Sequence, residues 1–245
     1  MTNLCQAIQE QTHRIAAAAV AANRSASHVR LMLATKTQSA ETLTAALACG
    51  ATLFGENRAQ ELVAKADAVN MAAHADGYAL PTWHFIGHLQ TNKVRDVVGR
   101  VACVQSVDRE SLATALQAEC VKKGVVLEVM IEINTSGEPS KHGVHPDEVW
   151  RLVDYVHGQS QLSIRGFMTI GALSEDEATV RRCFALLRSI GASYDATHGT
   201  KSELSMGMSH DLDWAIAEGS TMVRIGTAIF GSRTPQILGG GDARL

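Results

Sequence analysis

The sequence predicts an α/β fold, a single (β/α)8 barrel of the TIM type with an extra helix before its first strand, forming one domain over residues 1–245. Two observations support this prediction. Short apolar or β-branched runs alternate with helical patterns along most of the chain, as a parallel sheet with helical crossovers requires. Eight such units within 245 residues also match the size at which these sheets close into barrels. An open, doubly wound sheet is the second interpretation.

The first 25 residues have a helical pattern, in which Leu4, Ile8, Ile15 and several alanines form an apolar stripe. Eight strands are expected after this helix, and a helical pattern follows each of them except the last. The strands are expected near residues 30–34, 51–54, 83–86, 101–106, 126–133, 162–169, 203–206 and 221–225.

Two helix starts and two less regular segments complete the pattern. Ser39 is placed to cap one helix, and Pro146 stands in the first turn of another. The connection 68–82 is longer than the others, so we expect a surface loop or a helix extension there. The glycine-rich tail, 232–245, is expected to be flexible.

The charge pattern indicates which partners to expect. The formal net charge is -3, and basic and acidic residues are scattered, which predicts no nucleic-acid partner and favours small molecules. Charged residues interrupt the N-terminal helix, and no uncharged apolar run reaches the roughly 18 residues that a membrane span needs. We therefore expect a cytoplasmic protein that neither enters a membrane nor is exported.

The cysteines show no CxxC spacing and are odd in number: Cys5, Cys49, Cys103, Cys120 and Cys183. Most of them stand within apolar runs. This pattern fits small buried side chains in a reducing compartment better than disulfides or zinc ligands.

The carboxyl ends of the strands are where a barrel of this type places its active site. Lys36 follows the first expected strand and Asn57 the second. Ser209 follows the seventh strand, and Gly226 and Thr227 follow the eighth, where such barrels commonly bind a phosphate. A lysine amine on one side of the mouth and a phosphate site on the other predict pyridoxal 5'-phosphate as the ligand.

Five motifs along the chain closely resemble those of the pyridoxal phosphate homeostasis proteins, relatives of the N-terminal barrel of alanine racemase. They read "LATKT", "FGEN", "WHFIGHLQTNK", "SMGMSHDLDWAI" and "GSTMVRIGTAIFG", and the resemblance covers about residues 30–231. It implies a barrel of pyridoxal-phosphate fold type III. It also implies a protein that holds this cofactor and takes part in its intracellular homeostasis, by buffering or delivery.

The resemblance also assigns roles to individual residues. Lys36 would hold the cofactor as a Schiff base, Arg224 would face the pyridine nitrogen, and Ser209, Gly226 and Thr227 would surround the phosphate. The expected cofactor-binding set is completed by Asn57, His84 and Met206. No role follows for the loop "SGEPSKHG" at 136–143, which also resembles a family motif.

Several of these residues have simpler interpretations when taken singly. A lysine beside an apolar strand is usually a solvated surface side chain, and Arg224 would then be an ordinary ion-pair partner of an acid. The glycines would serve turns. Histidines near the strand ends, His84, His88, His142 and His210, match no metal motif in their spacing, so no metal site is predicted.

Two functions of different classes are compatible with the motifs. Arg224 would donate a hydrogen bond to an unprotonated pyridine nitrogen, which makes the cofactor a weaker electron sink. Racemisation also needs a second acid–base group, yet Tyr78, Tyr155 and Tyr194 fall in connections or helices, and the domain that supplies a tyrosine in alanine racemase is expected to be absent. A monomeric carrier without catalytic residues, which passes the cofactor to apo-enzymes, is therefore favoured over a fold-type-III racemase or lyase.

Overall fold

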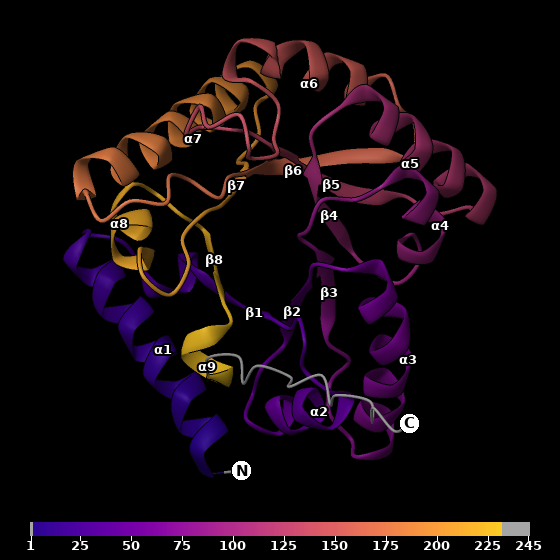
Figure 1. Cartoon of the computed structure of the whole chain (residues 1–245), viewed down its shortest axis with the longest axis vertical. Helices are drawn as coiled ribbons and strands as arrows, with labels where there is room; N and C mark the ends of the chain where they lie inside the picture. The colour runs from indigo at the N-terminus through magenta and orange to yellow at the C-terminus, as the bar shows by residue number, and fades with distance from the viewer. Residues whose placement is uncertain (1, 232–245) are drawn as a thin grey trace, which may run out of the picture.

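The computed structural model describes residues 2–231, and the tail predicted to be flexible, 232–245, lies outside the described residues. Within them, eight parallel strands form a closed barrel in chain order, and the last strand pairs with the first (Figure 1). Helices surround the strands on the outside. The predicted (β/α)8 barrel is confirmed, and the open, doubly wound sheet is wrong.

The strands are short and close to their predicted positions. They are β1 (Arg30–Ala34), β2 (Leu53–Glu56), β3 (Thr82–Phe85), β4 (Cys103–Val107), β5 (Leu127–Glu132), β6 (Leu162–Met168), β7 (Glu203–Ser205) and β8 (Met222–Ile225). The second strand begins two residues later than predicted because Gly50 and Ala51 still belong to the turn that ends the preceding helix, where they donate to Leu47 O and Ala46 O.

The helices follow the strands as expected, with short 3-10 turns between some of them. They are α1 (Thr2–Ala21), α2 (Ala40–Ala48), α3 (Ala59–Ala75), α4 (Val94–Val97), α5 (Glu110–Lys123), α6 (Val149–His157), α7 (Glu177–His198), α8 (Leu212–Ala217) and α9 (Thr227–Phe230). None of the helices in residues 2–231 combines the length and the apolar character that a membrane crossing needs.

Three local predictions can be compared with these helices. The Ser39 side chain accepts a hydrogen bond from Thr42 N and caps α2, as expected. The long 68–82 connection contains a helix extension, since α3 continues to Ala75. The prediction that no helix follows the last strand is wrong, because α9 begins directly after β8; its four residues are too few to show a helical period in the sequence.

Two hydrophobic clusters hold the barrel together. The larger one fills the space between the strands and the helices. The smaller one lies inside the barrel and is rich in methionine: Met32, Leu53, Ile86, Cys103, Met130, Met168 and Met222. Gly55 belongs to the same interior face, because a Cβ there would lie 2.5 Å from the Met32 sulfur. Since side chains alternate along a strand, the residues two positions beyond this interior layer point into the mouth.

The N-terminal helix α1 packs against α8 and α9, next to the pair of strands that closes the barrel (Figure 1). Its predicted apolar stripe is buried at Ile8 and Ile15. On another face, Arg14 donates a 2.7 Å hydrogen bond to Ser209 O and forms an ion pair with Asp213. The helix therefore supports the loop that follows β7.

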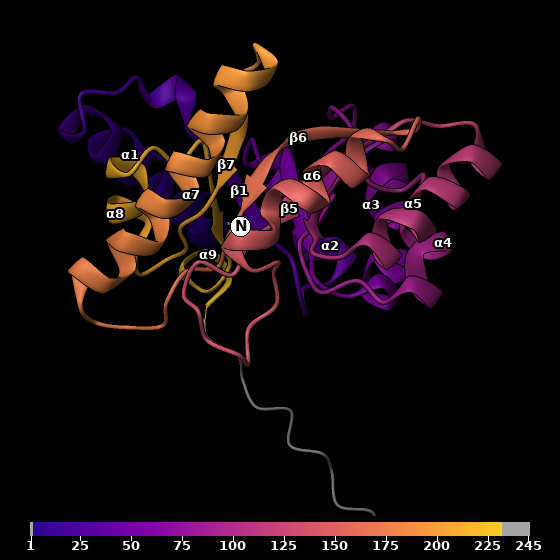
Figure 2. The same ribbon diagram turned by 90° about the horizontal axis from the view of Figure 1, so that it is seen from above.

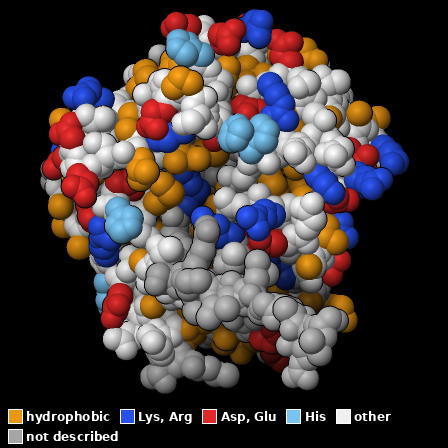
Figure 3. Space-filling model, in the orientation of Figure 1, with side chains coloured by type: hydrophobic (Ala, Val, Ile, Leu, Met, Phe, Trp, Pro, Cys, Tyr) orange, Lys and Arg blue, Asp and Glu red, His pale blue; other side chains and the backbone are white. Residues whose placement is uncertain are grey.

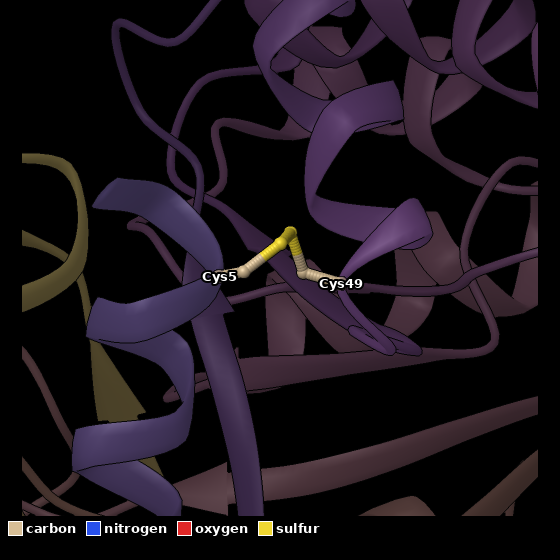
Figure 4. Close-up of a disulfide and its surroundings, with 2 residues drawn as sticks. All are labelled: Cys5 and Cys49. Atoms are coloured by element: carbon tan, nitrogen blue, oxygen red, sulfur yellow. A yellow bond between two sulfur atoms is a disulfide. The ribbon is translucent and has the colours of Figure 1, made fainter. Parts of the chain in front are cut away.

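The cysteine prediction is partly wrong. Cys5 of α1 and Cys49 at the end of α2 form a disulfide, with their Cα atoms 5.0 Å apart (Figure 4). These residues are separated by 44 positions, and only the packing of α1 against α2 brings them together. The other three cysteines, Cys103, Cys120 and Cys183, are free and buried as expected. The argument for a reducing compartment, which rested on unpaired thiols, loses part of its support.

Candidate functional site

The candidate site is the mouth at the carboxyl ends of the strands. Figure 2 shows the loops that follow β5 and β6 extending on one side of the barrel, the side on which α9 also lies. Figure 3 shows the molecule in the orientation of Figure 1, and basic, acidic and histidine side chains gather near the middle of this face. The mouth is thus polar above an apolar barrel interior.

Lys36 follows β1, which pairs with β2 on one side and with β8 on the other. Ala34 of β1 pairs with Gly55 of β2, and Lys36 and Asn57 each stand two positions after these partners, at the ends of adjacent strands. On the other side, Gly226 lies so close to β1 that a Cβ there would be 3.2 Å from Ala34 O. The ends of β2, β1 and β8 therefore form one continuous side of the mouth.

A buried ion pair supports the segment that carries Lys36. The amine of Lys65 in α3 lies 2.6 Å from a carboxylate oxygen of Glu56, and the two side chains are 6% and 0% exposed. The same amine donates to Thr35 O at 2.7 Å, and the Thr35 hydroxyl donates to Glu56 at 2.9 Å. Lys65 and Glu56 thus bind the residue just before Lys36.

The backbone after Lys36 is also fixed. Thr37 has φ of +65°, a left-handed conformation that a β-branched residue rarely adopts, and its N–H donates to Glu61 at 2.6 Å. Lys65 is committed to Glu56 and Glu61, whereas within residues 2–231 the Lys36 amine takes part in no ion pair. Lys36 is therefore the lysine available for chemistry on this side of the mouth.

Asn57 offers an unsatisfied acceptor. Its side-chain oxygen is buried and has no hydrogen-bond partner among the described residues. Its backbone is in contact with the next loop, since a Cβ on Gly87 would lie 2.2 Å from Asn57 O, so only glycine fits there. A buried carbonyl without a donor is costly. A ligand with a hydroxyl or an N–H group beside Lys36 would satisfy it, and the phenolic ring of pyridoxal phosphate fits this requirement.

The predicted phosphate residues come together across the β7 and β8 ends. The hydroxyl oxygens of Ser209 and Thr227 lie 3.4 Å apart. Gly207 adopts φ of +96°, and its carbonyl accepts a hydrogen bond from Arg224 N at 3.0 Å, which fixes the loop to β8. Met208 N donates to the Asp211 carboxylate at 2.6 Å and closes the turn that carries Ser209. Two neighbouring hydroxyl donors, one on the loop after β7 and one at the start of α9, suit a phosphate.

Arg224 lies at the floor of the mouth and is 6% exposed. One terminal nitrogen donates to the backbone and hydroxyl oxygens of Ser205, at 2.8 and 2.7 Å, and the other donates to Thr169 O at 2.8 Å. Neutral oxygens therefore hold the guanidinium, and the interpretation of Arg224 as an ordinary ion-pair partner is not supported. Burial lowers the pKa of Arg224 to about 10, so it stays charged at neutral pH.

His84 lies beneath Arg224 in a chain of buried hydrogen bonds. The Ser205 hydroxyl donates to the Gln105 side-chain oxygen at 2.7 Å, and the Gln105 amide nitrogen lies 2.7 Å from Nδ1 of His84. Burial, together with the charges of Arg30 and Arg165, lowers the pKa of His84 to about 3. His84 is thus neutral and serves to hold Gln105.

Two predicted residues are not at the mouth with the others. His84 is 3% exposed within the barrel, and the Met206 side chain is fully buried in the larger hydrophobic cluster. Their contact with a cofactor stays a prediction.

The three tyrosines are also away from the strand ends: Tyr78 follows α3, Tyr155 is in α6 and Tyr194 is in α7.

Glu132 is a mouth residue that the sequence reasoning missed. It ends β5, two positions after Met130 of the interior cluster, and is 3% exposed. Burial and the nearby Asp108 raise the pKa of Glu132 to about 7, although the charge of Arg224 opposes this shift. In a barrel of eight strands β5 lies across from β1, so Glu132 faces the mouth from the side opposite Lys36. The sequence does carry a signal for Glu132, because it lies two positions after Met130 and therefore on the same face of the strand.

Comparison with known proteins gives one family model and several close relatives. The model for the alanine racemase N-terminal domain matches residues 6–234. The pyridoxal phosphate homeostasis protein of Aquifex aeolicus is 37% identical over 232 residues, which cover 94% of this chain and 99% of that protein. The protein of the same name from Pseudomonas aeruginosa is 39% identical, over 95% and 97% of the two chains.

Solved structures extend the comparison to three dimensions. A Bifidobacterium adolescentis protein described as unknown has a TM-score of 0.89 at 38% identity, over 94% of this chain and 95% of that one. PipY of Synechococcus elongatus, with PLP bound, has a TM-score of 0.73 at 32% identity, over 83% and 93%. Alanine racemase from E. faecalis, at 17% identity and a TM-score of 0.67 over 94% and 58% of the two chains, shares the fold.

We expect Glu132→Gln to change the pH dependence of stability. Because the pKa of Glu132 is raised on folding, its contribution to stability is fully present below its ordinary pKa and is lost as pH rises through about 7. The shift from 4.5 to about 7 amounts to roughly 3 kcal/mol. The free energy of unfolding of Glu132→Gln, relative to wild type, should therefore increase between about pH 5 and pH 8.5.

Urea unfolding at several pH values measures this difference. The matched control is Glu128→Gln, on the same strand, where the side chain is half exposed. A Glu132→Gln difference that does not vary with pH would show that Glu132 is not protonated in the folded protein near neutrality.

Proposed function

The chain belongs to the family of pyridoxal phosphate homeostasis proteins, and we propose that it binds pyridoxal phosphate at the barrel mouth and takes part in the homeostasis of this cofactor. The family match over nearly the whole chain and the PLP-bound PipY structure support the proposal. The observation that supports it most is that β1, which Lys36 follows, pairs with β8, which Thr227 follows, while the Lys36 amine takes part in no ion pair of the described residues.

Each residue has a distinct task in this proposal. When bound, pyridoxal phosphate supplies a reactive aldehyde and an electron-withdrawing ring. Lys36 would hold the aldehyde group through its amine, and the hydroxyls of Ser209 and Thr227 would donate to the phosphate. The buried side-chain oxygen of Asn57, which has no partner among the described residues, would accept a hydrogen bond from the ligand. These four residues come from the ends of β1, β2, β7 and β8.

Arg224 sets the electronic state of the ring. The three hydrogen bonds to Ser205 and Thr169 leave two of the five guanidinium N–H donors for a ligand. An arginine with a pKa of about 10 keeps its protons at neutral pH, so Arg224 would donate a hydrogen bond to an unprotonated pyridine nitrogen and would not protonate it. This arrangement weakens the electron sink and suits a protein that stores the cofactor.

We propose further that the chain acts as a monomer and that it buffers the free cofactor or passes it to apo-enzymes. The absence of a tyrosine from the strand ends of the described residues supports a carrier over a racemase. Glu132 is the observation that favours the second candidate, a fold-type-III enzyme acting on small amino acids. A carboxyl group with a pKa near 7, across the mouth from Lys36, has the properties of a second acid–base group.

The first prediction concerns Lys36. The purified protein should be yellow, and reduction with borohydride followed by peptide mapping should place the label on Lys36. Lys36→Ala should lose the colour, whereas Lys141→Ala, which removes another lysine at the mouth, should keep it, because the Lys141 amine is already bound to Glu138 and Gly171 O. A label on any other lysine would contradict the assignment.

The second prediction concerns the phosphate. Thr227→Val should weaken pyridoxal phosphate binding by about a factor of ten, the effect of one hydrogen bond to a charged group. Pyridoxal, which lacks the phosphate, should bind the variant and the wild type equally. A titration that gives the same loss for both ligands would show that Thr227 supports the fold and does not bind phosphate.

The third prediction separates carrier from enzyme. Cofactor-loaded protein is mixed with a panel of L-amino acids, and chirality and keto-acid formation are followed over hours. A carrier shows no turnover. Turnover that disappears in both Lys36→Ala and Glu132→Gln would establish the enzyme and identify Glu132 as its second acid–base group.

A further inference from the structure

We propose that His88, Asp108 and His142 form a binding site for a divalent transition-metal cation such as Zn²⁺ on the rim of the mouth. The three residues belong to the loops that follow β3, β4 and β5. Each offers one ligand atom, and these atoms all lie within 4.8 Å of one another. None of the three belongs to the residues assigned to pyridoxal phosphate, so this is a second site on the same face of the barrel.

The first two ligands are held together by Arg109. One terminal nitrogen of Arg109 donates to the Asp108 carboxylate at 2.5 Å, and the other donates to Leu89 O at 2.7 Å. Leu89 directly follows His88, so this arginine ties the loop after β3 to the loop after β4. The second oxygen of Asp108 faces the His88 ring, 3.5 Å from Nδ1. Gly87 fixes the other side of His88, because its contact with Asn57 O leaves no room for a side chain.

The third ligand is carried by a well-braced loop. The Asn134 side chain donates to Glu138 O at 2.9 Å and to Lys141 O at 3.3 Å, and its backbone N–H donates to Val144 O. The Lys141 amine donates to Gly171 O at 2.7 Å, which fastens the loop to the end of β6. These bonds hold His142 over the mouth and give the motif at 136–143 a role that the sequence did not reveal.

The donor set and its spacing suit zinc. The imidazole rings of His88 and His142 are stacked with their centroids 3.9 Å apart, so one ring must turn before the lone pairs of both can point at one ion. Zinc–nitrogen and zinc–oxygen bonds of about 2.1 Å in a tetrahedral site place the ligand atoms about 3.4 Å apart. The 3.5 Å between Nδ1 of His88 and the Asp108 carboxylate already matches this spacing. Rotation of the exposed His142 side chain would bring its ring nitrogen from within 4.8 Å to the same spacing. Two imidazoles and one carboxylate leave a fourth position open for water or a small ligand.

The simpler explanation of this cluster is a stacked histidine pair that rests on an acid and binds nothing. The two explanations differ in what they predict for metal affinity. The chain offers a matched control in His145 and Asp147, an exposed histidine–carboxylate pair with a similar 3.4 Å separation, for which the described part of the chain provides no third ligand.

The test is calorimetric titration of Zn²⁺ into the full-length, cofactor-loaded protein, without an affinity tag and after removal of metals by a chelator. Wild type should bind one zinc per chain. His88→Ala and His142→Ala should each weaken this binding by at least about tenfold, since even changes to residues behind a metal ligand cost 10–100-fold. His145→Ala should bind as wild type does. Both ligand histidines are exposed, so we expect their removal to preserve the fold, which circular dichroism checks.

Two binding results would overturn the proposal. One is a wild type that binds zinc no more tightly than His88→Ala and His142→Ala. The other is equal loss in His145→Ala, which would indicate general surface binding. X-ray absorption at the zinc edge gives an independent measurement, and it should show two imidazole ligands. A sulfur shell would mean that cysteine holds the metal, and the site would be wrong.

Discussion

The buried ion pair between Glu56 and Lys65 is the interaction on which the geometry of the mouth depends. Removing one member of such a pair would leave an uncompensated charge away from water, so the two side chains stay together. Glu56 ends β2 and Lys65 belongs to α3, and both bind Thr35 at the end of β1. One contact thus fixes two strand ends and the helix behind them. The Glu56–Lys65 pair binds Thr35, and it thereby positions the segment that carries Lys36.

Arg224, on the strand that pairs with β1, is a buried charge in a different environment. Arg224 is charged and buried, yet backbone and hydroxyl oxygens surround it, while the acids Glu132 and Asp211 act on it from further away. A guanidinium bound directly to a carboxylate would have its charge neutralised and fewer donors free. Here no carboxylate of the described residues contacts the guanidinium directly, and its charge opposes the rise that burial and Asp108 cause in the pKa of Glu132. The arrangement is suited to a ligand that brings its own negative charge.

The sequence predicted the features that depend on local pattern and missed those that depend on packing. Strand–helix alternation was sufficient for the barrel, and the positions of Lys36, Asn57 and Thr227 follow from strand ends. The Cys5–Cys49 bond depends on how α1 packs against α2, which no local period encodes. Glu132 was missed because strands buried on both faces show no alternation that identifies the inner one. The stacking of His88 on His142 requires two loops to meet above the barrel.

Closure of the barrel has a consequence for the order of events during synthesis. The wall of the mouth that joins Lys36 to Gly226 exists only when β8 has paired with β1, and these strands come from opposite ends of the chain. A ribosome-bound chain that has not yet produced residues 222–227 has the lysine but neither the arginine nor the second hydroxyl. The binding pocket is therefore absent from every shorter nascent chain. Capture of a reactive aldehyde at this pocket is thus confined to molecules in which β8 has paired with β1.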